Sequence, residues 1–431
     1  MNSPDHRRQR RLIGGGWRGA IELRWITGQD QPREGVPALT GRGGRRGGRP
    51  SWSLLLAVVL LGINLRTVIA SLPPLLPEVR RDLGLSAVLA GLLTTLPVLC
   101  FGALAFLGPR LVRRVAIEHL LIACAAATAV AAALRGIDGL LTLFAGSLLA
   151  GVAVAVSQAI LPILVRTNHP DAVGPLMGAY SMALPLGATL AGGVSVPLAH
   201  VLGGSWRASL AAWSLPAGLA ALTWLAVAGR SGATRLRSPS PAPLRADPLA
   251  WAVAGFFGLQ SMAFYAGLTW LPAILQAHGW SPSSAGWLQA LSSLVSVLPA
   301  FTVPLLAGRS AGQRPLLAAV AATAGLGVGG LLVAPGAAPA WMVLLGLGQG
   351  GSLGLGLILP VLRARRPEVV ASLTAMTLSV GYVIAAIGPW VMGAAHDAAG
   401  GWTAGLLVLL GVTILQVVPG AAAARAGSVA S

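Results

Sequence analysis

The stretch that decides the fold is WSLLLAVVLLGINLRTVIASLPPLL, residues 52–76. An α-helix rises 1.5 Å per residue, so about 20 apolar residues cross a hydrocarbon core of about 30 Å. The stretch carries one charge, Arg66, which lies about 21 Å along a helix that begins at Trp52. A guanidinium at that depth costs about 2.5–3.5 kcal/mol on insertion scales and usually faces the interior of a helix bundle. We therefore interpret Arg66 as the floor of a polar cavity; the alternative is a structural arginine bound to a carbonyl or a helix end.

The rest of the chain continues this apolar pattern. Of 431 residues, 55% are apolar and 10% are charged, and the mean hydropathy is +0.76. Soluble domains carry about 25% charged residues, so the composition predicts a polytopic membrane protein. The apolar stretches are continuous and longer than the roughly 10 residues of a barrel strand, which predicts helices. Twelve such stretches occur, at residues 52–76, 85–108, 115–134, 139–162, 173–199, 207–229, 250–275, 284–308, 314–334, 339–362, 370–395 and 401–424.

All 30 basic residues of the Lys and Arg type are arginines, and the net charge is +18. Residues 1–50 contain 11 arginines and four acids without apolar periodicity, which predicts a disordered cytoplasmic tail that binds anionic lipid. The alternative, a nucleic-acid-binding arm, lacks interleaved aromatic residues beyond Trp17 and Trp25. We therefore expect a lipid partner for the tail and no nucleic-acid partner. No apolar segment with a cleavage site precedes Trp52, so we expect no secretory signal.

Arginines also alternate between successive loops. The loops after spans 2, 4, 6, 8 and 10 carry an excess of arginine, whereas the other loops are nearly neutral. Arg135, after span 3, is offset in this count by Asp138. The positive-inside rule then places both termini in the cytoplasm, and an even number of spans agrees with this. Because the chain has no lysine and is rich in Ala and Gly, we expect the cytoplasmic membrane of a bacterium with a GC-rich genome.

The two halves of the chain resemble each other. LGLSAVLAGLL (83–93) matches HGWSPSSAGWL (278–288) at five positions with an offset of 195, and ILPILVR (160–166) matches ILPVLRA (358–364) with an offset of 198. The prediction is an all-α membrane protein of twelve transmembrane helices in two pseudo-symmetric six-helix bundles. Parallel repeats of this kind place a substrate between two rocking halves. The predicted segments are a tail (1–50), an N-terminal bundle (51–229), a cytoplasmic linker (230–248), a C-terminal bundle (249–424) and a short cytoplasmic tail (425–431).

Polar side chains inside the apolar spans are few, and they define the candidate substrate site. The candidates are Asn64 and Arg66 in span 1, Gln158 in span 4, Gln260 and Tyr265 in span 7, Gln349 in span 10 and Tyr382 in span 11. Ser157, Tyr180, Ser181, Trp270 and Ser379 are further polar side chains within the spans. Around one arginine, neutral amides and tyrosines suit a small anion or a polar heteroaromatic compound, because the guanidinium pairs with charge and the rings stack. The alternative role for each glutamine is an interhelical hydrogen bond.

Asn64 and Arg66 present a conflict within the first span. They lie about 200° apart around a helix, so both face one cavity only where the helix is distorted, as Gly62 and Pro73 permit.

Other chemistries lack their sequence signatures. No Asp, Glu or His stands at mid-span, so proton coupling, if present, would use the substrate or an edge group such as Glu78. The chain has no Walker loop, no HExxH and no Cys/His cluster, so we expect no ATP drive, no enzyme activity, no cofactor and no metal site. Cys100 and Cys124 lie in apolar spans and are interpreted as buried small hydrophobes.

Five stretches carry a family resemblance: GINLRTVIASLPPLLPEVRRDLGLS, AGLLTTLPVLCFG, FFGLQSMAFYAGLTWLPAIL, LGLGQGGSLGLGLILPVLRAR and SVGYVIAAIGPWVMGAAHDAAGGW. Together they resemble the cyanate and 2-nitroimidazole transporter branch of the major facilitator superfamily, over about residues 52–418. The resemblance implies a secondary active transporter that works by alternating access on cyanate, a nitroimidazole-like heterocycle or another small polar or anionic compound. It also implies that a central site is lined by Asn64, Arg66, Gln260, Tyr265, Gln349 and Tyr382.

The chain departs from that family at Ser157-Gln158, where a Gly-Asn pair is expected, and at Pro185, where an Asn is expected. These departures affect the lining of the first half. Two other functions remain open: an efflux pump for drugs or heterocycles, and a non-transporting membrane sensor or scaffold. We expect a monomer.

Overall fold

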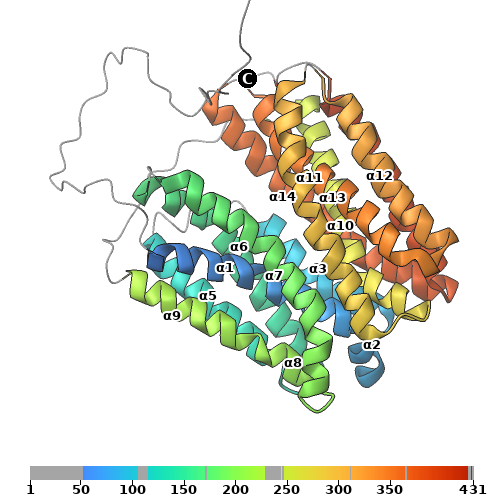
Figure 1. Cartoon of the computed structure of the whole chain (residues 1–431). Helices are drawn as coiled ribbons and strands as arrows, with labels where there is room; N and C mark the ends of the chain where they lie inside the picture. Colours follow the sequence, from blue (N-terminus) through green and yellow to red (C-terminus); the bar gives the residue numbers. More distant parts are fainter. Residues whose placement is uncertain are drawn as a thin grey trace, which may run out of the picture. The chain divides into compact units, whose positions relative to one another are not determined.

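The computed structural model describes residues 52–104, 115–169, 172–228, 247–310, 312–364 and 366–425, together with residues 244 and 429. The predicted tail (1–50), most of the predicted linker (230–248) and most of the predicted C-terminal tail (425–431) lie outside them. Within the described residues, the regular structure is helical, and twelve helical segments are long and apolar enough to cross a membrane (Figure 1). The predicted fold class is confirmed.

The first six spans contain eight described helices. They are α1 (Trp52–Ala70), α2 (Leu72–Leu83), α3 (Ala87–Leu104), α5 (Ile117–Leu134), α6 (Leu140–Asn168), α7 (Val173–Val201), α8 (Trp206–Ala212) and α9 (Ser214–Ala228). The first span is longer than predicted, because α2 extends it to Leu83 after a break at Ser71. Prolines stand in the first turn of α2, where the missing N–H has no intrahelical partner to lose. Gly84, with φ of 62°, ends α2 in the left-handed conformation.

The second six spans contain seven α-helices and one short 3₁₀ segment. They are α10 (Pro248–Ala277), α11 (Pro282–Arg309), α12 (Arg314–Val333), η2 (Pro335–Ala337), α13 (Ala338–Leu362), α14 (Pro367–Ala399), α15 (Trp402–Leu415) and α16 (Val417–Ala423). Asp247 caps α10 by accepting hydrogen bonds from the backbone N–H groups of Leu249 and Ala250, at 2.8 and 3.3 Å.

Helices that correspond in the sequence repeat pack in corresponding pairs. In the first half α1 packs against α7, α3 against α6, and α5 against α6 and α9. In the second half α10 packs against α14, α11 against α13, and α12 against α13 and α15. Between the halves, α3 packs against α14 and α7 against α11. These two contacts are equivalent, because each joins the second span of one half to the fifth span of the other. The repeat seen in the sequence is therefore a repeat of packing.

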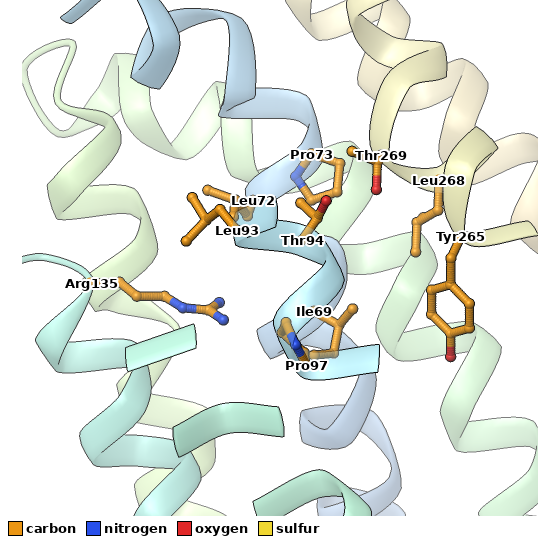
Figure 2. A pocket seen from close by; sticks show the side chains of 10 residues that line it. All are labelled: Ile69, Leu72, Pro73, Leu93, Thr94, Pro97, Arg135, Tyr265, Leu268 and Thr269. Atoms are coloured by element: carbon orange, nitrogen blue, oxygen red, sulfur yellow. The ribbon is translucent and has the colours of Figure 1, made fainter. Parts of the chain in front are cut away.

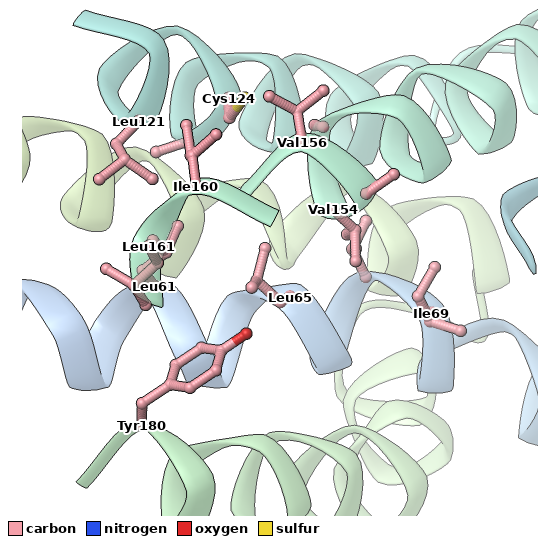
Figure 3. Packing of buried hydrophobic residues seen from close by; sticks show 14 of the residues in the cluster. Leu61, Leu65, Ile69, Leu121, Cys124, Val154, Val156, Ile160, Leu161 and Tyr180 are labelled. Atoms are coloured by element: carbon pink, nitrogen blue, oxygen red, sulfur yellow. The ribbon is translucent and has the colours of Figure 1, made fainter. Parts of the chain in front are cut away.

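The first half encloses an apolar core around α1. Leu61 and Leu65 of α1 are 1% and 0% exposed, and they lie among buried side chains of α5 and α6 such as Leu121 and Leu161 (Figure 3). Tyr180 of α7 belongs to the same cluster and points toward α1 from the side opposite to α6 (Figure 3). This packing fixes the rotation of α1, and so decides which of its residues face the second half.

The halves contact each other where α2, α10 and α14 end and α3 begins, a region that we call the distal end. Both carboxylate oxygens of Asp397 on α14 accept hydrogen bonds from the first N–H groups of α3, those of Ala87 and Val88, at 3.1 and 2.9 Å. Arg80 Nη2 lies 3.8 Å from the same carboxylate. At Gly91 the backbones approach so closely that an added Cβ would lie 2.6 Å from the carbonyl oxygen of Pro389. The distal end is thus closed by polar contacts and by backbone packing.

Candidate functional site

Arg66 bridges the two halves of the molecule. Its Nη1 donates a hydrogen bond to the hydroxyl oxygen of Tyr265 on α10, at 3.1 Å. Residues 65 and 67 beside it on α1 are buried, yet Arg66 keeps an intermediate exposure, so its side chain reaches space that water can enter. The ion pairs found among the described residues join arginines 80 and 207 to aspartates, and none of them involves Arg66. The hydrogen-bond partner of the Arg66 guanidinium is therefore a neutral hydroxyl, that of Tyr265.

Aromatic rings from three helices surround this bridge. Tyr382 of α14 stands 6.3 Å from the ring of Tyr265 and 5.5 Å from each of Phe101 on α3 and Phe257 on α10, measured between ring centroids. Phe264 packs edge-on against Tyr265 at 5.1 Å. Edge-to-face contacts of this kind hold the rings at fixed angles; Phe101, Phe257 and Tyr265 are buried, whereas Tyr382 is half-buried. Neither Phe101 nor Phe257 was among the predicted site residues, because a phenylalanine in an apolar span carries no distinguishing signal.

The other two tyrosines of the chain also lie near Arg66. Tyr180, on α7, packs against Gly62 of α1, about one helical turn before Arg66, and the ring of Tyr382 lies beside that of Tyr265. Tyr180 is 6% exposed and Tyr265 is 4% exposed, whereas Tyr382 is half-buried. All three tyrosines of the chain therefore gather around one arginine.

The amide side chains occupy different surroundings. Asn64 is 2% exposed and donates through Nδ2 to the carbonyl oxygens of Leu60 and, across to α9, Pro216, at 2.7 and 3.0 Å. Because α1 runs unbroken from Trp52 to Ala70, Asn64 and Arg66 stay on opposite sides of it. The structure therefore does not bring Asn64 together with Arg66.

The three predicted glutamines lie on three different helices and have different surroundings. Gln260 is 3% exposed, and its Nε2 donates to Ser261 Oγ at 2.6 Å. Gln349 on α13 is half-buried; its Nε2 is buried without a hydrogen-bond partner and approaches α10 at Gly267. Gln158 is half-buried on α6.

A small cavity lies beside Tyr265, and a second arginine borders it. Its lining includes Ile69 and Pro73 from the first span, Thr94 from α3, and Thr269 from α10 (Figure 2). Arg135, which follows the last residue of α5, completes the wall and is 2% exposed. The cavity has room for about one water molecule.

The charge count of the loop after span 3 set Asp138 against Arg135 without predicting that the two side chains form an ion pair. Asp138 does not pair with Arg135; it pairs with Arg207 on α8, whose Nε lies 2.5 Å from Asp138 Oδ1. A charge count does not tell which arginine a carboxylate contacts. Sequence reasoning missed Arg135 because it stands at the edge of a span, where boundaries are uncertain by a few residues.

The sequence matches the family model of the Major Facilitator Superfamily over residues 54–389. The chain belongs to the major facilitator superfamily. Three bacterial relatives are similar over nearly their whole lengths. An uncharacterized transporter, YycB, of Bacillus subtilis is 34% identical over 87% of this chain and 94% of its own. The 2-nitroimidazole transporter of Escherichia coli is 33% identical over 86% of this chain and 95% of its own.

The cyanate transport protein CynX of Escherichia coli is 31% identical over 84% of this chain and 96% of its own. The predicted family is therefore confirmed, and the protein is a multi-pass bacterial membrane protein whose relatives are named as transporters. Its fold is also that of a bacterial homologue of the human lysosomal transporter Spinster, crystallised in an inward-facing and occupied conformation. The TM-score is 0.71 at 17% identity, covering 86% of this chain and 94% of that one.

Proposed function

We propose that this superfamily member is a secondary active transporter that moves a small anion or a polar heteroaromatic compound by alternating access. Cyanate and a nitroimidazole-like heterocycle are the first compounds to test, because two of the relatives are named for them. The observation that carries the proposal is the hydrogen bond from Arg66 to Tyr265, which joins the two halves at a guanidinium that water can reach.

The charge of Arg66 favours an anion. A guanidinium stays protonated in proteins, and in surroundings of low dielectric its uncompensated charge attracts an anion far more strongly than it does in water. Tyr265 occupies one of its five N–H donors, which leaves others for a carboxylate, nitro or cyanate oxygen. The rings of Tyr265, Tyr382 and Phe101 would stack on the planar part of a heteroaromatic compound.

The seven predicted residues divide by role in this proposal. Arg66, Tyr265 and Tyr382 contact the transported compound. Gln349 and Gln158 are half-buried, and they supply hydrogen bonds at its edge. Asn64 and Gln260 are buried and do not contact the compound. Asn64 joins α1 to α9 through Pro216, and Gln260 donates to Ser261 within α10.

Binding and movement are coupled because the compound contacts both halves. A ligand held between Arg66 on one side and Tyr265 and Tyr382 on the other stabilises the arrangement in which the halves close around it. The halves would rock along the paired contacts of α3 with α14 and of α7 with α11. The arginine excess of alternate loops supports cytoplasmic termini, so the distal end would face the outside of the cell, with anionic lipid at the arginine-rich tail.

Counterflow into proteoliposomes tests the proposal. Vesicles of purified protein, preloaded with unlabelled cyanate or 2-nitroimidazole, should accumulate the labelled compound. The Arg66→Gln variant should lose this accumulation, while a matched change of an exposed arginine, Arg309→Gln, should keep it. If Arg66→Gln, folded and at equal density in the vesicles, transports as well as the unsubstituted protein, Arg66 does not hold the compound.

A second candidate function is the export of drug-like heterocycles, and the ring cluster around Tyr382 favours it. A deletion strain that becomes sensitive to nitroimidazoles, but still takes up and uses cyanate, would support export. A strain that loses cyanate uptake and shows no drug sensitivity would support import.

A further inference from the structure

The cavity beside Tyr265 lies on the distal side of Arg66. Along the first span, Ile69 and Pro73 follow Arg66, and on α10 Thr269 follows Tyr265 by about one helical turn, or about 6 Å. The distal contacts of Asp397 with the start of α3 close the molecule beyond it. The cavity therefore lies between Arg66 and the distal end, where a larger and more open pocket is lined by Arg80, Gln276 and Trp402.

Arg135 gives this cavity an unbalanced positive charge. Its Nη1 donates a hydrogen bond to the carbonyl oxygen of Val68, while its Nε is buried without a hydrogen-bond partner. The guanidinium points from α5 toward the cavity wall formed by Ile69 and Leu93 (Figure 2). No acidic side chain of the described residues forms an ion pair with Arg135, because Asp138 is paired with Arg207.

We propose that this cavity is a second anion-binding position, in which Arg135, Thr94 and Thr269 receive the transported anion on its way between the distal end and Arg66. The inference rests on the proposed function. The cavity has room for about one water molecule, and because its lining comes from the first span, α3 and Arg135 on one side and from α10 on the other, it would widen when α10 moves away from α2 and α3. Tyr265 borders the cavity and also binds Arg66, so it stands between the two guanidinium groups.

The competing explanation is that Arg135 only braces the break between α1 and α2. Val68 precedes that break at Ser71 by three residues, and a hydrogen bond to its carbonyl would hold the end of α1. A neutral donor satisfies a carbonyl without the cost of burying a charge, however, and a brace does not require the threonine hydroxyls opposite. The two explanations therefore predict different results for variants that keep or remove the charge.

Transport from each face separates these explanations. Right-side-out and inverted membrane vesicles would be supplied with labelled cyanate, and the KM measured for entry from each face. We expect Arg135→Gln to raise the KM from the distal face about tenfold or more, as expected when a charged hydrogen-bonding group is lost, and to change the KM from the other face less than twofold. Arg135→Lys, which keeps the charge, should restore most of the distal affinity. Thr269→Val, which leaves the bond to Val68 in place, should raise the distal KM by about threefold.

Each result assigns success or failure to one proposal. If Arg135→Gln and Thr269→Val leave the distal KM unchanged, or alter the KM from both faces equally, the second position does not exist and Arg135 is a brace. If Arg135→Gln does not fold, Thr269→Val alone decides, because Arg135→Lys keeps the charge and both explanations expect a nearly unchanged distal KM for it. If the unsubstituted protein carries cyanate and Arg66→Gln does not, the proposed function stands whatever these variants do. Transport that persists in Arg66→Gln contradicts the proposed function instead.

Discussion

The carboxylate of Asp397 offers the sharpest test of how the distal end closes. It accepts two hydrogen bonds from the N-terminus of α3 and lies 3.8 Å from Arg80, and all three contacts join the two halves. Replacing a helix-capping aspartate by alanine costs about 0.5–2 kcal/mol, and a partly exposed ion pair adds about 0.2–1 kcal/mol. Asp397→Ala should therefore weaken the closed distal end by about 1–2 kcal/mol, which is a shift of about 5–30-fold toward the open state.

Cysteine accessibility measures this shift. Thr94→Cys, in a background where Cys100 and Cys124 are replaced by alanine, places a thiol in the cavity that the distal contacts cover. A small, membrane-impermeant thiol reagent applied from the distal face should react about 5–30 times faster when Asp397→Ala is added. Asp138→Ala is the matched control, because Asp138 pairs with Arg207 inside the first half. Equal rates in Asp397→Ala and the control would refute the claim that this carboxylate holds the halves together.

Three further predictions concern the bridge, the helix interface and the orientation. Tyr265→Phe removes the hydroxyl that accepts a hydrogen bond from Arg66 and keeps the ring contacts. Because a hydrogen bond to a charged group contributes about 1.5–3 kcal/mol, the rate of counterflow should fall by about tenfold or more. An unchanged rate would count against the bridge. Gly91→Val places atoms against the backbone of Pro389, so it should hold the distal end open and abolish transport, whereas Gly218→Val, at a position with nothing within 4 Å, should be silent. An impermeant maleimide should label Ala337→Cys on intact cells and Arg309→Cys only in inverted vesicles, and the reverse pattern would invert the proposed topology.

The fold was predictable because bilayer thickness leaves a strong signal in the sequence. Twelve apolar stretches of spanning length gave twelve spans, with boundaries displaced by a few residues. The clearest displacement is at the first span, where α2 continues to Leu83. The last two turns of α2 carry Arg80 and Arg81 with acidic neighbours. A low hydropathy there is typical of a loop, although the helix continues to the distal end.

The candidate site was predictable only in part, because a polar residue in a span does not reveal its own direction. The helical wheel separated Asn64 from Arg66, and the unbroken helix α1 keeps them apart. The pairing of Arg66 with Tyr265 depends on how the two halves pack, which no local pattern contains. The burial of Arg135 likewise depends on the end of α1, to which it donates a hydrogen bond.

Equilibrium binding to the purified protein tests the central claim, that the Arg66 guanidinium holds the transported compound. Labelled cyanate and labelled 2-nitroimidazole would be titrated against the unsubstituted protein and against Arg66→Gln, with Arg309→Gln as the control for an exposed arginine. The account predicts saturable binding of at least one compound to the unsubstituted protein and to Arg309→Gln, and a loss of about tenfold or more in affinity for folded Arg66→Gln, as for a charged hydrogen-bonding group removed from a buried site. Equal affinity in all three proteins would contradict it.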